Sequence, residues 1–175
     1  MDEVKTIRHN SSFGLELFIH GALCYSFAGM CLFSSYLGGM SANRGRCTQP
    51  CRRTYYKKNS PGLLFNLKDN QLIDHIPLLA DLGVDSLKIE GRLKSPEYVY
   101  TTARAYRMVL DDSSRLQEAK ELLHLDMGRE KTSWFFGGKT GKAISNHTAT
   151  GLFLGRVVKS GNNTITVDTT RTLPQ

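Results

Sequence analysis

Short apolar runs bounded by turn-forming residues predict strands within the first ninety residues of the chain. In the first run four apolar residues surround a single acid, which is typical of a buried strand, and it stops at His20 and Gly21. From residue 21 to residue 53 the chain is rich in small and turn-forming residues, which predicts loops with a short helix. The predicted strands lie at residues 15–19, 63–67 and 86–89.

Apolar residues at helical spacing follow the second of these strands. Asp69 or Asn70 is suited to cap a helix that runs to Leu82, and Gly83 is suited to stop it. Pro77 lies inside this segment and is expected to kink the helix.

A second helix has a well-marked beginning after the third strand. Ser95 supplies a cap hydroxyl, Pro96 suits the first helical position, and Glu97 places an acid in the first turn. We expect this helix to reach about Leu110 and a shorter helix to cover residues 114–123. The order strand–helix–strand–helix favours right-handed parallel βαβ units, and therefore an α/β fold.

From residue 151 onward the sequence becomes β-rich. Two runs joined by a polar turn at residues 160–163 predict a hairpin, with strands at 152–159 and 164–168. Because two strands alone are marginally stable, we interpret this hairpin as the start of a small β-rich C-terminal module. The predicted organisation is a βα segment with a cysteine cluster at 1–136, a linker at 137–150, and the start of the module at 151–175.

The positive charge of the chain is concentrated in one stretch. Lys and Arg outnumber Asp and Glu by 23 to 16, for a net charge of +7. Residues 17–68 contain seven basic residues and no acid, so the remainder of the chain is neutral. Tyr55 and Tyr56 lie among these basic residues, a combination that suits contact with a nucleic-acid backbone and base stacking. A solvated surface loop is the alternative interpretation. The basic residues proposed to bind substrate RNA are Arg44, Arg46, Arg52, Arg53, Lys57 and Lys58.

The sequence also bears on the compartment. The first ten residues carry both signs of charge and lack the apolar run of a signal peptide. Residues 17–43 lack any Asp, Glu, Lys or Arg and are long enough to cross a bilayer, but a histidine, four serines, four glycines and two cysteines make them too polar for a lipid-facing helix. We therefore expect a cytoplasmic protein with no membrane partner.

All four cysteines lie in the acid-free stretch, at Cys24, Cys31, Cys47 and Cys51. In the cytoplasm, clustered cysteines are more often metal ligands than disulfides. Four thiolates suit an iron–sulfur cluster, and zinc is the weaker alternative because the tight C-x2-C pairs of zinc ribbons are absent. A third interpretation is four reduced cysteines that pack as small apolar residues.

Three blocks of the sequence resemble the collagenase-like peptidase family, peptidase family U32. The resemblance covers roughly residues 15–109 and is specific, because long stretches match without gaps. The blocks are ELFIHGALC at 16–24, NRGRCTQPCR at 43–52 and SLKIEGR at 86–92, with SPEYV at 95–99 extending the last.

The resemblance implies a fold, a cofactor and a site. Members of the family are similar to TIM-type (β/α) barrels with a small β-rich C-terminal module, so this chain is expected to hold a partial barrel of about three of the eight βα units. The first barrel strands would come from a missing upstream segment or a partner subunit. Several members are implicated in oxygen-independent hydroxylation of RNA bases or of ubiquinone precursors with a 4Fe–4S cluster. By resemblance, Cys24, Cys31, Cys47 and Cys51 are the candidate ligands.

Three polar residues lie where strands of such a barrel would end. In a βα barrel the chemistry takes place at the carboxyl ends of the strands, so we expect His20, Glu90 and Arg92 to face the same mouth as Cys24. His20 and Glu90 are candidates to move protons, and Arg92 to hold an anionic group. The alternatives are a packed, hydrogen-bonded histidine and an internal ion pair between Glu90 and Arg92.

These observations lead to three functional hypotheses. The first is an iron–sulfur enzyme of the oxygen-independent hydroxylation type that acts on RNA, with no DNA partner expected. The second is a peptidase, as the family label says, although the sequence contains neither a G-x-S-x-G elbow nor an H-E-x-x-H helix. The third is a non-catalytic fragment that binds metal or a partner subunit.

Overall fold

The computed structural model of the chain describes residues 1–27, 29–124, 126, 128–133, 136, 143–148 and 155–170. The α-helices are α1 (Asp2–Asn10), α2 (Phe33–Gly38), α3 (Ile76–Asp81), α4 (Pro96–Asp111) and α5 (Leu116–His124). The strands are β1 (Glu16–Ala22), β2 (Tyr55–Lys57), β3 (Ser60–Gly62), β4 (Asp69–Gln71), β5 (Ser86–Ile89), β6 (Lys131–Thr132), β7 (Arg156–Ser160) and β8 (Ile165–Asp168). Short 3₁₀ helices are η1 (Ala42–Arg44), η2 (Pro50–Arg52), η3 (Ile73–His75) and η4 (Ser113–Arg115).

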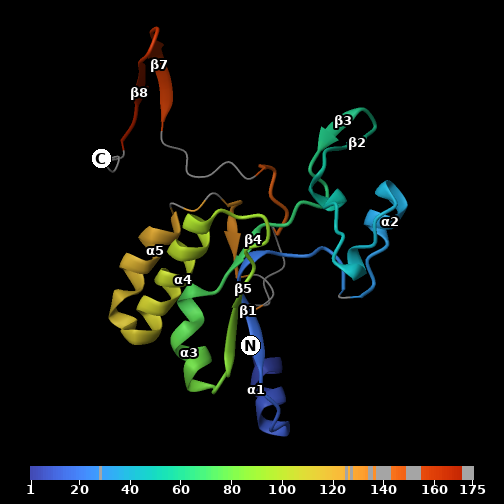
Figure 1. Ribbon diagram of the computed structural model, residues 1–175, viewed down its shortest axis with the longest axis vertical. Coiled ribbons are helices and arrows are strands. Elements are labelled where there is room, and N and C mark those ends of the chain that lie inside the picture. Colours follow the sequence, from blue (N-terminus) through green and yellow to red (C-terminus); the bar gives the residue numbers. More distant parts are fainter. Residues whose placement is uncertain are drawn as a thin grey trace.

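A four-stranded sheet in the order β5–β1–β4–β6 forms the centre of the molecule (Figure 1). Strands β1 and β5 pair in parallel, with Leu17 beside Leu87. The predicted parallel unit of strand, α3 and β5 does not form, because β4, the strand directly before α3, is not the neighbour of β5 and runs in the opposite direction. Strand β4 runs antiparallel to β1 and parallel to β6, so the sheet is mixed. The chain is therefore a mixed α/β protein, and the sheet of the described residues is not closed into a barrel.

Helices α3, α4 and α5 lie together on one side of the sheet (Figure 1). Helix α4 begins where the sequence predicts, because the Ser95 hydroxyl accepts a hydrogen bond from the backbone N–H of Tyr98 at 3.3 Å. The apolar side of α4 packs with α3, α5 and β1 to form the core. The core includes Ile19, Leu72, Ile73, Ile76, Leu79, Ala105, Tyr106, Val109, Ala119 and Leu123.

The strand predicted at residues 63–67 is wrong. The described structure has only an isolated bridge there, between Leu67 and Ile144, and the strand forms later as β4. The predicted helix start at Asp69 or Asn70 is wrong for the same reason, since both residues lie in β4. Asn70 donates its side-chain amide to the Phe18 carbonyl at 3.0 Å instead of capping a helix, so cross-strand partners outweigh the local capping preference.

Residues 23–65, which we call the cysteine lobe, leave the sheet after β1 and return to it before β4 (Figure 1). A small group of partly buried aromatic rings packs together in this lobe. Phe65 lies 5.3 Å from Tyr25, 5.7 Å from Phe33 and 5.3 Å from Tyr55, measured between ring centroids. Packing of this kind holds the loops that carry the four cysteines.

The C-terminal hairpin predicted from the sequence is confirmed by the antiparallel pairing of β7 with β8. The Gly161 N–H closes its turn on the Thr164 carbonyl at 2.8 Å. Of the predicted linker, residues 143–148 are described, and the Lys68 N–H donates to the Ala143 carbonyl at 2.8 Å. Residues 137–142 and 149–154 lie outside the described residues. Within the described part of the chain, no helix is long and apolar enough to cross a membrane.

Candidate functional site at the carboxyl edge of the sheet

The ends of β1 and β5 meet at one edge of the sheet. The Glu90 N–H donates to the His20 carbonyl at 2.8 Å, so the two predicted site residues lie on neighbouring strands. Gly21 has a φ of 108°, and a Cβ on this residue would overlap the backbone of Glu90. A glycine is therefore required for this close approach.

His20 is enclosed by protein on both sides of its ring. An irregularity in the β1–β5 register falls between Phe18 and His20, and the His20 side chain is only 1% exposed. Its Nδ1 lies 3.2 Å from the Tyr106 hydroxyl, which itself donates to the Ile19 carbonyl at 2.9 Å, and its Nε2 lies 3.2 Å from Asp126 Oδ2. Burial lowers the pKa of His20, and the hydrogen bond with Asp126 opposes this only in part.

Next to His20 lies a buried group of charges that we call the ionic cluster: Asp69, Asp126, Arg129 and Lys131. Arg129 Nε donates to Asp69 Oδ1 at 2.9 Å, and Lys131 Nζ lies 2.6 Å from Asp126 Oδ2. Asp69 and Asp126 are 1% and 8% exposed, so each buried carboxylate needs its cation. Hydrogen bonds from His20 and Lys131 lower the pKa of Asp126 and outweigh its burial.

The ionic cluster borders a groove: Asp126, Arg129 and Lys131 line a hollow of about 430 Å³. The Tyr98 ring lies 6.0 Å from the His20 ring between centroids, and the Tyr98 hydroxyl is buried and has no hydrogen-bond partner among the described residues. Burial raises the pKa of Tyr98 strongly, and the nearby carboxylates of the ionic cluster raise it further. The sequence analysis named His20 as a site residue but not Tyr98 or the four members of the ionic cluster. Only their position in the fold distinguishes the members of the ionic cluster from ordinary surface charges.

Glu90 and Arg92 do not form the internal ion pair that was one alternative. Glu90 Oε1 accepts a hydrogen bond from the backbone N–H of Arg92 at 2.7 Å. The guanidinium of Arg92 is exposed. An exposed guanidinium at the strand edge is free of a buried carboxylate and can meet an anion from solvent.

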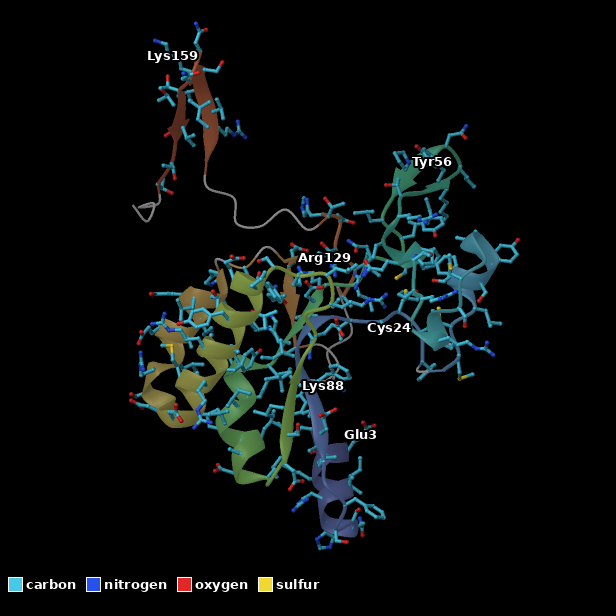
Figure 2. The ribbon with its side chains drawn as sticks, viewed as in Figure 1. Glu3, Cys24, Tyr56, Lys88, Arg129 and Lys159 are labelled. Atoms are coloured by element: carbon cyan, nitrogen blue, oxygen red, sulfur yellow. The ribbon has the colours of Figure 1, made fainter. Side chains whose placement is uncertain are left out.

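The four cysteines are free thiols in the cysteine lobe. Figure 2 shows Cys24 on the segment that leads from the sheet into the lobe. Cys47 Sγ accepts a hydrogen bond from the Gln49 N–H at 3.3 Å and lies 3.8 Å from the Ser34 hydroxyl. Burial raises the pKa of the Cys51 thiol, the neighbouring Arg52 guanidinium opposes this rise, and Cys47 and Cys24 add to it.

Cys31 lies in the adjoining loop, where its backbone N–H donates to Asn43 Oδ1 at 3.2 Å. In the described residues, no group of three or more His, Cys, Asp or Glu side chains is arranged to hold a metal ion. The chemistry of the donor set nevertheless fits an iron–sulfur cluster, because it offers four reduced thiols and no hard oxygen ligand. The N–H bond to Cys47 is of the kind that tunes metal-bound sulfur.

Arg52 connects the cysteine lobe to the sheet. Its Nη2 donates to the Leu23 carbonyl at 2.6 Å, and its Nη1 donates to Asn66 Oδ1 at 3.0 Å and to the Leu67 carbonyl. Burial lowers the pKa of Arg52, which nevertheless remains far above neutrality for a guanidinium. Arg52 thus ties together the two ends of the lobe. One end is Leu23, directly before Cys24, and the other is formed by Asn66 and Leu67, where the chain returns to the sheet.

The other basic residues of the predicted RNA site lie on the surface of the lobe. All five are exposed, and no acidic residue exists between Leu17 and Lys68 to neutralise them. The structure therefore separates them from Arg52, whose guanidinium is directed inward. The exposed set is Arg44, Arg46, Arg53, Lys57 and Lys58.

Known proteins similar to this chain include RNA-modifying proteins and a collagenase. It is 37% identical over 151 residues to the 23S rRNA 5-hydroxycytidine C2501 synthase of Escherichia coli, covering 82% of this chain and 22% of that protein. It is 35% identical over 159 residues to tRNA hydroxylation protein P1 of Bacillus subtilis, covering 79% of this chain and 38% of that protein. It is 43% identical over 105 residues to a collagenase of Porphyromonas gingivalis, covering 55% of this chain and 29% of that protein.

This chain thus spans between about a fifth and two fifths of the length of these relatives. No solved structure matches it significantly. A family model described as peptidase family U32 matches residues 1–146, which is most of the chain and includes all four cysteines, the ionic cluster and the strand edge. The chain therefore belongs to peptidase family U32.

Proposed function

We propose that this chain is part of an iron–sulfur-dependent enzyme of the oxygen-independent hydroxylation type whose substrate is RNA. The observation that carries the proposal is the cysteine lobe: four reduced cysteines on an acid-free, basic surface at the edge where β1 and β5 end. Two similar proteins are named for hydroxylation of rRNA or tRNA, which supports the same substrate class. An RNA substrate and reduced thiols both agree with the cytoplasmic location expected from the sequence.

In this proposal Cys24, Cys31, Cys47 and Cys51 hold a 4Fe–4S cluster, with zinc as the weaker alternative. Such a cluster supplies one-electron transfer when bound. The hydrogen bond from the Gln49 N–H to Cys47 would stabilise a thiolate at that position. The exposed cations of the lobe would bind the phosphates of the RNA.

The residues at the strand edge take different roles in the same proposal. Arg92 is exposed and would hold an anionic group, and the neighbouring Glu90 would accept or return a proton. His20 is buried between Tyr106 and Asp126, so we assign it to positioning the strand edge and orienting the carboxylate of Asp126.

We also propose that the β1–β5 pair and helices α3 and α4 form part of a TIM-type barrel. The parallel pairing of β1 with β5 and the packing of helices on one side of the sheet support this arrangement. The strands that would complete the barrel would come from a further segment or from a partner subunit.

A peptidase is the second candidate function, because the chain is also similar to a protein named collagenase. A dyad of Cys24 and His20 is the pairing that the sequence offers for it. Both ring nitrogens of His20 are engaged by Tyr106 and Asp126, so neither is directed to a thiol. These contacts therefore speak against a Cys24–His20 dyad, and the peptidase stays the second candidate.

Anaerobic purification of the chain, with iron analysis and absorption spectroscopy, tests the proposal. We expect a broad band near ~400 nm and bound iron in the unmodified chain. Cys24→Ser and Cys31→Ser should lose iron to the same extent, because each removes one thiolate from a shared site. His20→Gln is the matched control and should retain iron.

A peptidase would give a different pattern. Cys24→Ser would abolish peptide hydrolysis, and Cys31→Ser would leave it unchanged. Unchanged iron in Cys24→Ser, or a colourless protein that binds zinc, would overturn the iron–sulfur assignment.

A further inference from the structure

The hairpin formed by β2 and β3 is a preorganised projection of the cysteine lobe. Its strands are joined by a two-residue turn, Lys58-Asn59, in which both residues have positive φ, 49° and 67°. Positive φ at both central positions is the mark of a type I′ turn, whose twist matches that of the paired strands. The hairpin stands out from the molecule beside α2 (Figure 1).

The two tyrosines of β2 lie on opposite faces of this hairpin, because successive side chains alternate along a strand. The Tyr55 ring stacks on Phe33 with centroids 5.9 Å apart, and its hydroxyl donates to the Pro50 carbonyl at 2.8 Å. Tyr55 thus anchors the hairpin to the lobe. The Tyr56 side chain on the other face is 74% exposed, and Figure 2 shows it on the projecting hairpin.

Tyr56 is part of a flat apolar surface. Pro61 is its direct cross-strand partner, so the two side chains share one face of the hairpin. Thr54 and Pro61 line a groove of about 490 Å³ whose opposite wall includes Asn146 and His147. We call this the hairpin groove; Tyr56 does not line it but adjoins it through Pro61, its cross-strand partner.

The far wall of the hairpin groove is held in place from inside. Asn66, which is 1% exposed, donates its side-chain amide to the Ser145 carbonyl at 3.1 Å and to the His147 carbonyl at 2.9 Å. Arg52 Nη1 in turn donates to Asn66 Oδ1 at 3.0 Å. Both walls are therefore fixed before any ligand arrives, which lowers the entropic cost of binding.

Charge identifies the kind of ligand that this surface fits. Arg53, Lys57 and Lys58 lie within three positions of Tyr56, with Lys57 at the end of β2 and Lys58 in the turn, and none of the three makes an ion pair within the described residues. A flat aromatic and proline surface surrounded by unpaired cations suits a polyanion that carries flat, unpaired rings. Unpaired RNA has this chemistry, whereas a duplex keeps its bases stacked inside.

We propose that the hairpin groove binds unpaired nucleotides of RNA, with one base stacked on Tyr56 and Pro61 and the adjacent phosphates on Lys57 and Lys58. The inference rests on the proposed function for its substrate class, and it adds the binding element. The hairpin would present an unpaired region of the RNA to the lobe that carries the cysteines.

Fluorescence anisotropy with a labelled oligouridylate of about twelve nucleotides tests the stacking contact. We expect Tyr56→Ala to weaken binding about 10-fold, because an aromatic platform loses its stacked base. Tyr56→Phe should bind like the unmodified chain. Tyr36→Ala is the matched control, since Tyr36 lies on α2 and is 87% exposed, and it should leave binding unchanged. Binding by Tyr56→Ala within about twofold of the unmodified chain would overturn the proposal.

The phosphate contacts have their own test. Replacing both Lys57 and Lys58 by Gln should lower the slope of log K against log salt by about 1.4, or ~0.7 for each single-strand phosphate contact released. Lys5→Gln on α1 is the control for charge alone and should leave the slope unchanged. Two results would refute recognition of unpaired RNA. One is that Tyr56→Ala weakens binding of a duplex of the same length as much as it weakens binding of the single strand. The other is that oligoglutamate displaces the labelled RNA as effectively as unlabelled RNA does.

The outcomes separate this inference from the proposed function. Oligouridylate binding that depends on Tyr56, in a chain that holds no iron, supports the hairpin groove and contradicts the iron–sulfur assignment. Iron that is lost in Cys24→Ser, together with RNA binding that is indifferent to Tyr56, supports the cluster and overturns the hairpin groove.

Discussion

Replacing Arg52 by Met should release the cysteine lobe from the sheet. The substitution keeps an unbranched apolar stem and removes the guanidinium that holds three oxygen acceptors on two separate segments. Leu67 and Asn66 are 3% and 1% exposed, so water cannot replace the lost donor at either of them without opening the structure.

The expected loss follows from these contacts. A buried acceptor that loses a hydrogen bond costs about 1–1.5 kcal/mol, and the Leu23 carbonyl is half-buried and costs less. The sum is about 3 kcal/mol in the free energy of unfolding, or about a hundredfold in the folding equilibrium. Arg52→Lys should recover about 1 kcal/mol, since a lysine keeps the charge but cannot span acceptors on both segments.

Urea unfolding followed by circular dichroism measures this loss, and the rate of thiol labelling reports on the lobe. Labelling of Cys51, the half-buried thiol next to Arg52, should accelerate in Arg52→Met, because the lobe is no longer held at the Leu23 carbonyl. Arg53→Met is the matched control: the residue is the next one along the chain, is exposed, and should change stability by less than about 0.5 kcal/mol. If Arg52→Met and Arg53→Met are equally stable and equally slow to label, Arg52 is not a structural tie.

Three further predictions concern the strand edge and the helix beside it. Burial lowers the pKa of His20 below its ordinary value of 6.5, so on acidification the unfolded chain takes up a proton before the folded chain does. The stability contributed by neutral His20 is therefore complete above pH 6.5 and is lost as the pH falls below that value. Urea midpoints measured at a series of pH values should therefore decline on acidification, and less so in His20→Gln; an unchanged slope in that variant would show that another group, such as Asp126, governs this range. Gly21→Ala should lower the free energy of unfolding by about 2 kcal/mol or more, because φ is 108° and the new Cβ would overlap Glu90; a melting temperature equal to that of the unmodified chain would contradict the close approach. Ser95→Ala should cost about 1 kcal/mol through loss of the helix cap, and Ser95→Asp should restore it, as thermal unfolding can determine.

Local features of this protein could be read from the sequence because they depend on neighbouring residues. Ser95, Pro96 and Glu97 begin α4 as their chemistry requires, and residues 86–89 form β5 at the predicted bounds. The C-terminal hairpin also forms around its polar turn. The family blocks and the acid-free stretch with four cysteines are likewise properties of the sequence itself. In each case a cap, a turn or a short apolar run carries its own signal, without contacts from distant parts of the chain.

The arrangement of the candidate site was decided only by the tertiary structure. His20 meets Asp126 across 106 positions, and Arg129 meets Asp69 across 60. In the sequence these are ordinary charged residues, and Asp69 even resembles a helix cap. Arg52 was grouped with the surface cations for the same reason. A charged side chain that is buried loses its contact with water and must pair with another protein group. Which side chains are buried depends on how the strands of the sheet pair and which helices cover the sheet. Pairing between distant strands fixes that environment, so the sequence determines which groups are present and the fold determines which of them face each other.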